Sequence, residues 1–181
     1  MSAQAAAEAE KEKDQETDKA LLEEVGDQYL TFQLAEEDYG IDILRVQEIR
    51  GWDEVTRLPN APEYVRGVVN IRGTIVPVYD LRLKFSMPFR EYTKNTVVIV
   101  IRTETHKGSK SVGVVVDAVA DVLHGHLIDI TQSPDFGREQ MTEAISGLAT
   151  FQDKMVVLLD VDKLVKDDTE ETNDDEEDSE E

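Results

Sequence analysis

Hydrophobic and polar residues alternate along the middle of the chain with the two-residue period that is typical of β-strands. In Tyr29–Leu34, the apolar side chains of Leu30, Phe32 and Leu34 are separated by polar ones, as a strand with one buried face requires. Other runs are almost continuously apolar and β-branched, which indicates strands buried on both faces. These runs are Val97–Ile101, Val112–Val116 and Met155–Leu159. The pattern as a whole predicts an all-β core with few helices.

Turn residues and short helical patterns complete the predicted elements. Val68–Ile71 and Thr74–Tyr79 flank Arg72 and Gly73, and they predict a hairpin in which glycine supplies the positive φ of a tight turn. Pro77 indicates that the second arm of this hairpin is an edge strand or contains a bulge. A further strand is predicted at Tyr39–Ile43, and three short helices at Leu44–Ile49, Ala61–Val65 and Asp160–Val165.

The sequence contains an internal repeat. Gly40–Ile49 aligns without gaps on Gly113–Val122, and Gly67–Leu81 aligns on Gly147–Val161. Chance similarity between valine-rich strands would explain either alignment alone, but both occur in the same order. Two diverged copies of one unit of about 70 residues explain them better. Short strands in this number, with frequent turns, favour small barrels over a layered α/β fold.

Charge is distributed unevenly over the 181 residues, whose formal net charge is −21. Residues 1–27 hold nine acidic and three basic residues, and residues 166–181 hold 11 acidic residues and one lysine. The segment 28–165 therefore has a net charge of only −5. Neither end can bury enough apolar surface to offset the entropy of ordering. We predict disordered acidic extensions at 1–27 and 166–181, the second serving for solvation or as an interaction arm.

Composition excludes several classes of function. Nucleic acids and anionic membranes are bound through clustered Lys and Arg, which a chain with 40 acidic and 19 basic residues does not favour. The absence of cysteine excludes disulfides, thiol nucleophiles and thiolate metal sites. Met1–Glu10 lacks the profile of a signal peptide, and no apolar run approaches the ~20 residues that span a bilayer. We therefore expect a soluble, cytoplasmic protein.

Candidate chemical groups are few. His124 and His126 are two residues apart, a spacing that suits a metal ion, but no third ligand accompanies them. Asp117 and Asp121 would suit paired acid–base chemistry, although at repeated positions carboxylates fit strand ends or helix caps better. No phosphate-binding loop, nucleophile elbow or dinucleotide-binding glycine motif is present. The sequence favours a protein that is not an enzyme and that uses no cofactor.

Arg72 is the most distinctive residue at a predicted turn. The hairpin places it at the tip beside Gly73, where its side chain is presented to solvent. Glu48, at the end of the predicted first helix, is the nearest candidate acid. We hypothesise that Arg72 and Glu48 form an ion pair that shapes a surface for a partner, the alternative being an ordinary solvated arginine.

Two long motifs in this region resemble the CheW family, the coupling proteins of prokaryotic chemotaxis. Tyr39–Arg50 is similar to the first signature of the family, and Val65–Arg82 to its second and most specific one. Three further segments follow in the order of the family, namely Thr96–Ile101, Val112–Val122 and Met155–Leu164. The resemblance covers residues 28–165 and leaves out both acidic ends.

The resemblance implies two packed five-stranded β-barrels of SH3-like type, in agreement with the duplication read from the residues. The first barrel unit would span about 28–90 and the second about 95–165, with exchange of strands between them possible. It also implies an adaptor that is not an enzyme and that joins the cytoplasmic tips of chemoreceptors to the histidine kinase CheA. Such a protein would be cytoplasmic and recruited to membrane-associated receptor arrays.

By position, seven residues correspond to those at which the function of the family is sensitive or with which receptor binding is associated. They are Val46, Glu48, Gly67, Arg72, Thr96, Val97 and Val98. A groove lined by Val46, Val97 and Val98 would receive apolar anchors of a receptor helix. The alternatives are a small-barrel module for another signalling partner or ligand, and a metal-binding protein that uses His124 and His126.

Overall fold

The computed structural model describes residues 27–132 and 143–166. The acidic extensions predicted at 1–27 and 166–181 lie outside the described residues, apart from Asp27 and Lys166. Most of the described residues lie in β-strands, and the all-β prediction is confirmed. No helix in the described part has the length and the apolar character needed to cross a membrane.

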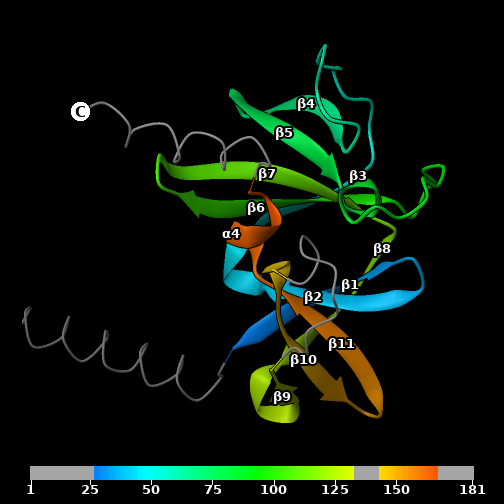
Figure 1. Ribbon diagram of the computed structural model, residues 1–181, viewed down its shortest axis with the longest axis vertical. Helices are drawn as coiled ribbons and strands as arrows, with labels where there is room; N and C mark the ends of the chain where they lie inside the picture. The colour runs from blue at the N-terminus through cyan, green and yellow to red at the C-terminus, as the bar shows by residue number, and fades with distance from the viewer. Residues whose placement is uncertain (1–26, 133–142, 167–181) are drawn as a thin grey trace, which may run out of the picture.

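The strands form two sheets that lie one above the other (Figure 1). One sheet has the order β8-β1-β2-β11-β10-β9, and the other has the order β3-β6-β7-β5-β4. The six-stranded sheet contains β1 (Gln28–Leu34), β2 (Glu37–Asp42), β8 (Ala118–His124), β9 (Asp129–Thr131), β10 (Ile145–Phe151) and β11 (Lys154–Leu159). The five-stranded sheet contains β3 (Val46–Gly51), β4 (Val65–Ile71), β5 (Thr74–Asp80), β6 (Val97–Thr105) and β7 (Gly108–Val116).

Short helical turns connect strands in the described part of the chain, among them η1 (Ile43–Arg45), α2 (Leu81–Lys84), η2 (Gly125–Leu127) and α4 (Val161–Leu164). The resemblance implied five strands in each barrel, whereas one sheet has six. The additional strand is β9, a three-residue strand that pairs with β10 from Thr131 opposite Leu148 to Asp129 opposite Thr150.

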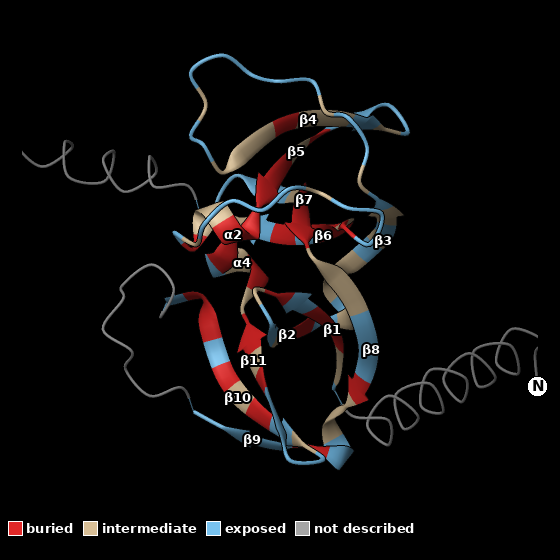
Figure 2. Cartoon of the chain, turned by 90° about the vertical axis from the view of Figure 1, so that its right-hand side faces the viewer, coloured by how far each residue is buried: buried red, intermediate tan, exposed pale blue. Residues whose placement is uncertain are grey.

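The buried residues form three clusters. The main core lies between the sheets and takes side chains from both, and each sheet also encloses a smaller inner core. Strand β6 serves two of these cores, because Ile99 and Ile101 face the main core while Val98 and Val100 face the inner core of the five-stranded sheet. This alternation confirms the prediction of a strand buried on both faces. Figure 2 shows the buried residues concentrated in strands such as β5, β6 and β7.

The repeat read from the sequence is present in the geometry. Each copy contains a register shift one residue before its glycine, between Val65 and Gly67 in one copy and between Ile145 and Gly147 in the other. Each copy also ends its hairpin in an aspartate that caps a four-residue helix, Asp80 for α2 and Asp160 for α4. The main-chain N–H of Asp80 donates to the carbonyl of Tyr64 and that of Asp160 to the carbonyl of Ala144, at 2.7 and 2.8 Å.

Strands are exchanged between the two halves of the chain. Strand β5 runs parallel to β7, with Val78 opposite Gly113, and β11 runs parallel to β2, with Leu158 opposite Gly40. Each sheet therefore contains strands from both halves of the chain. The boundary between two barrel units that was expected near residues 90–95 does not coincide with a boundary between the two sheets. Separating the two halves of the chain would break both parallel ladders as well as the main core.

Two predicted helices are wrong. Leu44–Ile49 forms only the end of η1 and most of β3, because β6 offers a complete antiparallel ladder to this segment. Ala61–Val65 is a turn that leads into β4. The third prediction is confirmed by α4, and the repeat-related helix α2 was missed. Pro77 does not mark an edge strand, since β5 lies between β7 and β4, and the bulge of this pair lies on β4.

Candidate functional site

Glu48 and Arg72 form an ion pair between the two edge strands of the five-stranded sheet. Glu48 lies on β3, and Arg72 lies in the turn between β4 and β5, where both Arg72 and Gly73 have positive φ angles of 52° and 86°. The Arg72 Nη2 atom lies 3.7 Å from Glu48 Oε2. The hypothesised pair is therefore present, but the Arg72 side chain is 87% exposed, so the pair adds little to stability.

Gly67 fixes the path of the crossing segment, residues 52–64, which connects β3 to β4. Thr56 in this segment pairs with Val68, exchanging main-chain hydrogen bonds of 3.0 and 2.8 Å. A Cβ atom on Gly67 would lie 2.3 Å from the carbonyl oxygen of Thr56 and 2.9 Å from a methyl group of Val55. Gly67 also has a φ of +149°, which side chains disfavour. Any larger residue would push the crossing segment away from β4.

Thr96 is buried and holds the start of the same crossing segment. Its carbonyl accepts a hydrogen bond of 3.0 Å from the N–H of Trp52, and its Oγ1 accepts one of 2.8 Å from the N–H of Thr93. The ring of Trp52 packs on Tyr92, with the ring centroids 4.1 Å apart. Thr96 and Gly67 thus position opposite ends of one segment, and neither needs to touch a partner to affect its binding.

The three valines do not line a common groove. Val46 and Val97 are half-buried and pack against the main core. Val98 is only 4% exposed and belongs to the inner core of the five-stranded sheet. Because Val97 and Val98 are consecutive in β6, their side chains point to opposite faces of the sheet. The expected groove lined by all three valines is therefore wrong, because Val98 lies in a different core from Val46 and Val97.

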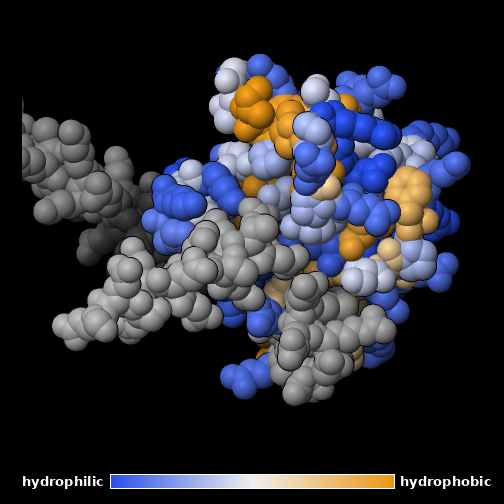
Figure 3. All heavy atoms as spheres, turned by 45° about the horizontal axis from the view of Figure 1, so that its top comes forward, coloured by the Kyte–Doolittle hydropathy of each residue, from blue (hydrophilic) through white to orange (hydrophobic). Residues whose placement is uncertain are grey.

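Val98 contributes instead to the floor of a hollow between the edge strands. The hollow has a volume of about 220 Å³ and is open to solvent between β3 and β4. It is lined by Arg50, Gly51, Asp53, Glu54, Val55, Thr56, Val68, Val69, Asn70 and Val98. Figure 3, which brings the β4–β5 end of the molecule forward, shows separate apolar patches among hydrophilic side chains on this face.

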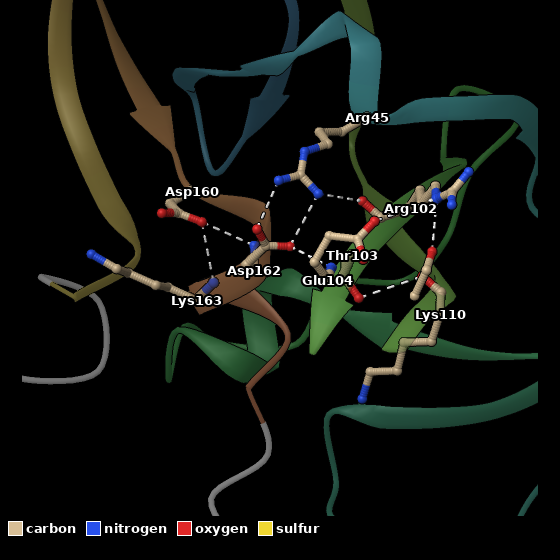
Figure 4. Close-up of polar contacts among 9 residues, drawn as sticks. Arg45, Arg102, Thr103, Glu104, Lys110, Asp160, Asp162 and Lys163 are labelled. Carbon is tan, nitrogen blue, oxygen red and sulfur yellow. Dashed lines mark hydrogen bonds and ion pairs between the residues drawn. The ribbon is translucent and has the colours of Figure 1, made fainter. Parts of the chain in front are cut away.

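Arg45 and Asp162 form a network that the sequence did not indicate (Figure 4). Arg45 donates from Nη1 and Nη2 to the two carboxylate oxygens of Asp162, at 3.2 and 2.8 Å. Asp162 also accepts a hydrogen bond of 2.7 Å from the N–H of Glu104, and Arg45 contacts the carbonyl of Arg102 at 3.4 Å. The network joins η1 and α4 to β6, and thus links segments from both ends of the fold.

A second ion pair, partly buried, joins α2 to the end of β7. Arg82 donates from Nε to Asp117 Oδ1 at 2.8 Å, and Arg82 Nη2 also contacts Asp117 Oδ2. Asp117 Oδ2 further accepts a hydrogen bond of 2.9 Å from the N–H of Ala35. Burial alone would raise the pKa of Asp117, but the hydrogen bonds from Arg82 and Ala35 hold it below its ordinary value. Asp117 is thus a structural anion, not a partner of Asp121 in acid–base chemistry.

Tyr92 and the two neighbouring histidines are the other titratable groups of interest. Tyr92 donates a 2.6 Å hydrogen bond to Asp80 Oδ2, and burial together with this bond raises the pKa of Tyr92 above its ordinary value. The rings of His124 and His126 lie 5.7 Å apart. Within residues 27–132 and 143–166, no group of three or more His, Cys, Asp or Glu side chains is placed to hold a metal ion.

Comparison with known proteins shows to which family the chain is related. The family model of the CheW-like domain matches residues 28–169. This chain belongs to the CheW-like domain family. The resemblance seen in the sequence is thereby confirmed, and the matched segment begins at the predicted boundary, Gln28.

Individual relatives agree with the family model. The chain is 47% identical to the chemotaxis protein CheW of Klebsiella aerogenes over 143 residues, which cover 79% of this chain and 84% of the relative. It is 32% identical to the chemotaxis protein CheW of Rhizobium meliloti over 139 residues, covering 77% and 87%. The crystal structure of the scaffolding protein TtCheW from Thermoanaerobacter tengcongensis superposes with a TM-score of 0.69 at 30% identity, covering 79% of this chain and 94% of that one.

Proposed function

We propose that this protein is a chemotaxis adaptor, without enzymatic activity, that couples the cytoplasmic tips of chemoreceptors to the histidine kinase CheA. Membership of the CheW-like domain family supports this function, and so do relatives that are named chemotaxis and scaffolding proteins. The observation that carries the proposal is the Glu48–Arg72 pair, in which Arg72 is 87% exposed and Glu48 30%, and which presents a charged recognition feature across the edge strands β3 and β4.

The seven candidate residues divide into contact residues and positioning residues. Arg72 and Glu48 are exposed enough to touch a partner directly. Gly67 and Thr96 act through the crossing segment, whose two ends they hold. Val46, Val97 and Val98 all belong to the ladder that pairs β3 with β6, and this ladder holds the strand that carries Glu48. Substitution at any of the seven would disturb the same surface.

The fold suits an adaptor because its two sheets share one core. The functional unit is the segment 28–165, in which units of about 28–90 and 95–165 exchange strands. A change at one sheet reaches the other through the main core and the Arg45–Asp162 network. An adaptor transmits the state of a receptor when its contacts differ between the states of its partners. We place the protein in the cytoplasm, recruited to receptor arrays at the membrane.

Binding measurements with purified proteins test this function. The full chain is titrated with a receptor cytoplasmic fragment and, separately, with CheA, and receptor control of kinase activity is then measured with and without the chain. We expect binding to both proteins and receptor control only when the chain is present. Failure to bind either protein would overturn the adaptor function and favour a small-barrel module for another signalling partner.

A further inference from the structure

A second hollow lies beside the crossing segment and combines aromatic and cationic side chains. It has a volume of about 330 Å³ and is lined by Trp52, Glu54, Val55, Arg57 and Arg66. The guanidinium of Arg66 lies 5.2 Å from the ring centroid of Phe89 and 5.7 Å from that of Tyr92. Tyr92 in turn packs on Trp52. Tryptophan, tyrosine and arginine are the residues most often found at the energetic centres of binding surfaces.

The two arginines of this hollow are not compensated by ion pairs. Arg57 is exposed and Arg66 is half-buried, and neither is within salt-bridge distance of a carboxylate in the described part of the chain. Only Glu54 contributes an acidic group to the lining. A guanidinium has five N–H donors, so Arg66 keeps donors for the oxygens of a carboxylate even while it interacts with Tyr92. The hollow therefore suits an acidic segment of extended chain.

Such a segment begins close by in the same molecule. The last described residue, Lys166, accepts a hydrogen bond of 3.2 Å at its carbonyl from Lys84 Nζ. Lys84 Nζ lies 4.2 Å from the ring centroid of Tyr64, which is two residues before Arg66. The 15 residues that follow, 167–181, hold 11 acidic residues and no basic one. Fully extended, they span up to ~50 Å, which is enough to reach the hollow.

We propose that segment 167–181 binds in this hollow of its own chain, with carboxylates paired to Arg57 and Arg66. Attachment at Lys166 gives the segment a high effective concentration, so weak pairs suffice. The rest of the chain is itself acidic, so the attraction is local and is screened when the Debye length shortens with salt. Because Thr96 and Gly67 position Trp52 and Val55, the bound segment covers the surface that these residues shape. The bound segment therefore competes, within its own chain and in a salt-sensitive way, with any partner that binds this surface.

The composition of the chain allows a direct test in the full-length protein. Trp52 is the only tryptophan and there is no cysteine, so one introduced cysteine carries one spin label. Ser179→Cys places the label among the acidic residues of the C-terminal segment, and Ser2→Cys places it at the other acidic end as the matched control. Quenching of Trp52 fluorescence by the label then reports contact with the hollow.

At ~20 mM salt, where the Debye length exceeds ~20 Å, we expect the label at 179 to quench Trp52 at least about twofold more than the label at 2. The excess should disappear at ~0.5 M salt. It should also disappear in Arg57→Gln with Arg66→Gln, and should fall in Arg57→Gln alone, an exposed change that leaves folding intact by circular dichroism. The proposal would be overturned if the two labels quenched Trp52 equally, or if quenching by the label at 179 were unchanged in the arginine variants. Quenching that weakens on dilution would assign the segment to a second copy and overturn the intramolecular arrangement.

This experiment contains no receptor and no kinase. Its outcome is therefore independent of the proposed adaptor function, and either result can stand with or without the other.

Discussion

The guanidinium of Arg45 and the carboxylate of Asp162 form a bidentate pair, and the pair has a charge-reversed counterpart elsewhere in the fold. Asp162 is the second residue of α4, and Arg82 is the second residue of the repeat-related α2. Arg82 pairs with Asp117, which follows β7, and Asp162 pairs with Arg45, which closes η1 after β2. In both pairs the carboxylate also accepts a main-chain N–H, from Ala35 or from Glu104. In the repeat, Arg82 aligns with Asp162, whereas Asp117 aligns with Leu44, the residue before Arg45. The two links therefore share one equivalent end, differ by one position at the other, and have the signs of the charges exchanged.

Exchange of the charges at Arg45 and Asp162 tests how much this link stabilises the fold. Both side chains are about one-third exposed, and the bidentate geometry favours a contribution above that of an ordinary surface pair. We expect Arg45→Asp and Asp162→Arg each to lower the free energy of unfolding by about 1–2 kcal/mol. The double variant should lose less than the sum of the single losses. Urea unfolding of the four proteins measures the coupling.

The control for this cycle is Arg102→Ala. Arg102 lies 3.6 Å from Glu104, but both side chains are more than half exposed, so its loss should cost less than about 0.5 kcal/mol. Strictly additive losses at Arg45 and Asp162 would mean that the bidentate pair contributes no coupling energy to the stability of the fold.

The Arg82–Asp117 pair predicts a pH dependence of stability. The pKa of Asp117 is lowered in the folded state, so the folded protein binds the proton of this group less readily than the unfolded chain does. Its contribution is fully present above the unfolded value of about 3.9 and is lost as the pH falls through the lower folded value. We expect Asp117→Asn to be less stable than the wild type at pH 6, with the difference shrinking between about pH 4 and pH 2. Denaturant unfolding across this range checks it, and a constant difference would contradict it.

Gly67→Ala should disturb both stability and the candidate surface. The added methyl group would meet the Thr56 carbonyl at 2.3 Å in a backbone conformation that alanine disfavours. We expect a loss of at least about 2 kcal/mol in the free energy of unfolding and a shift in Trp52 emission as the crossing segment moves. Gly51→Ala is the matched control, since nothing lies within 4 Å of a Cβ there. Equal effects of the two substitutions would show that the close approach at Gly67 is unimportant.

The sequence predicted the strands well because their signal is local. Alternation in β1 and continuous apolar runs in β6 and β7 reflect the faces that each strand buries. The helix expected at Leu44–Ile49 failed because the spacing of Val46 and Ile49 also fits a strand, and only the ladder with β6 decides between the two. The sequence did not decide whether strands are exchanged between the two halves. A repeat shows that the halves are equivalent, but it does not show which strands of one half pair with strands of the other.

The candidate site was predictable where one residue carries the signal. A glycine beside an arginine at a hairpin tip located Arg72, and the segment before it supplied Glu48 as its partner. The opposite orientation of Val97 and Val98 follows from the predicted strand Val97–Ile101, in which consecutive side chains alternate between faces, and the expected groove overlooked this alternation. The Arg45–Asp162 pair joins residues 117 positions apart, and no local pattern connects them.

Arg72→Asp tests whether the Glu48–Arg72 surface binds a partner. Arg72 is 87% exposed, and its ion pair spans 3.7 Å, so the substitution should leave the free energy of unfolding within about 0.5 kcal/mol of the wild type. It also places two carboxylates side by side where a partner would meet one cation and one anion. We expect the affinity for the receptor fragment, for CheA or for both to fall at least tenfold, equivalent to about 1.4 kcal/mol. Arg102→Asp, at an exposed arginine on the inner strand β6 of the same sheet, is the control and should bind as the wild type does. Unchanged binding of Arg72→Asp to both proteins would place the contact surface elsewhere, while equal losses in both variants would indicate a general effect of net charge. A specific loss would identify the gap between β3 and β4 as the surface through which the adaptor acts.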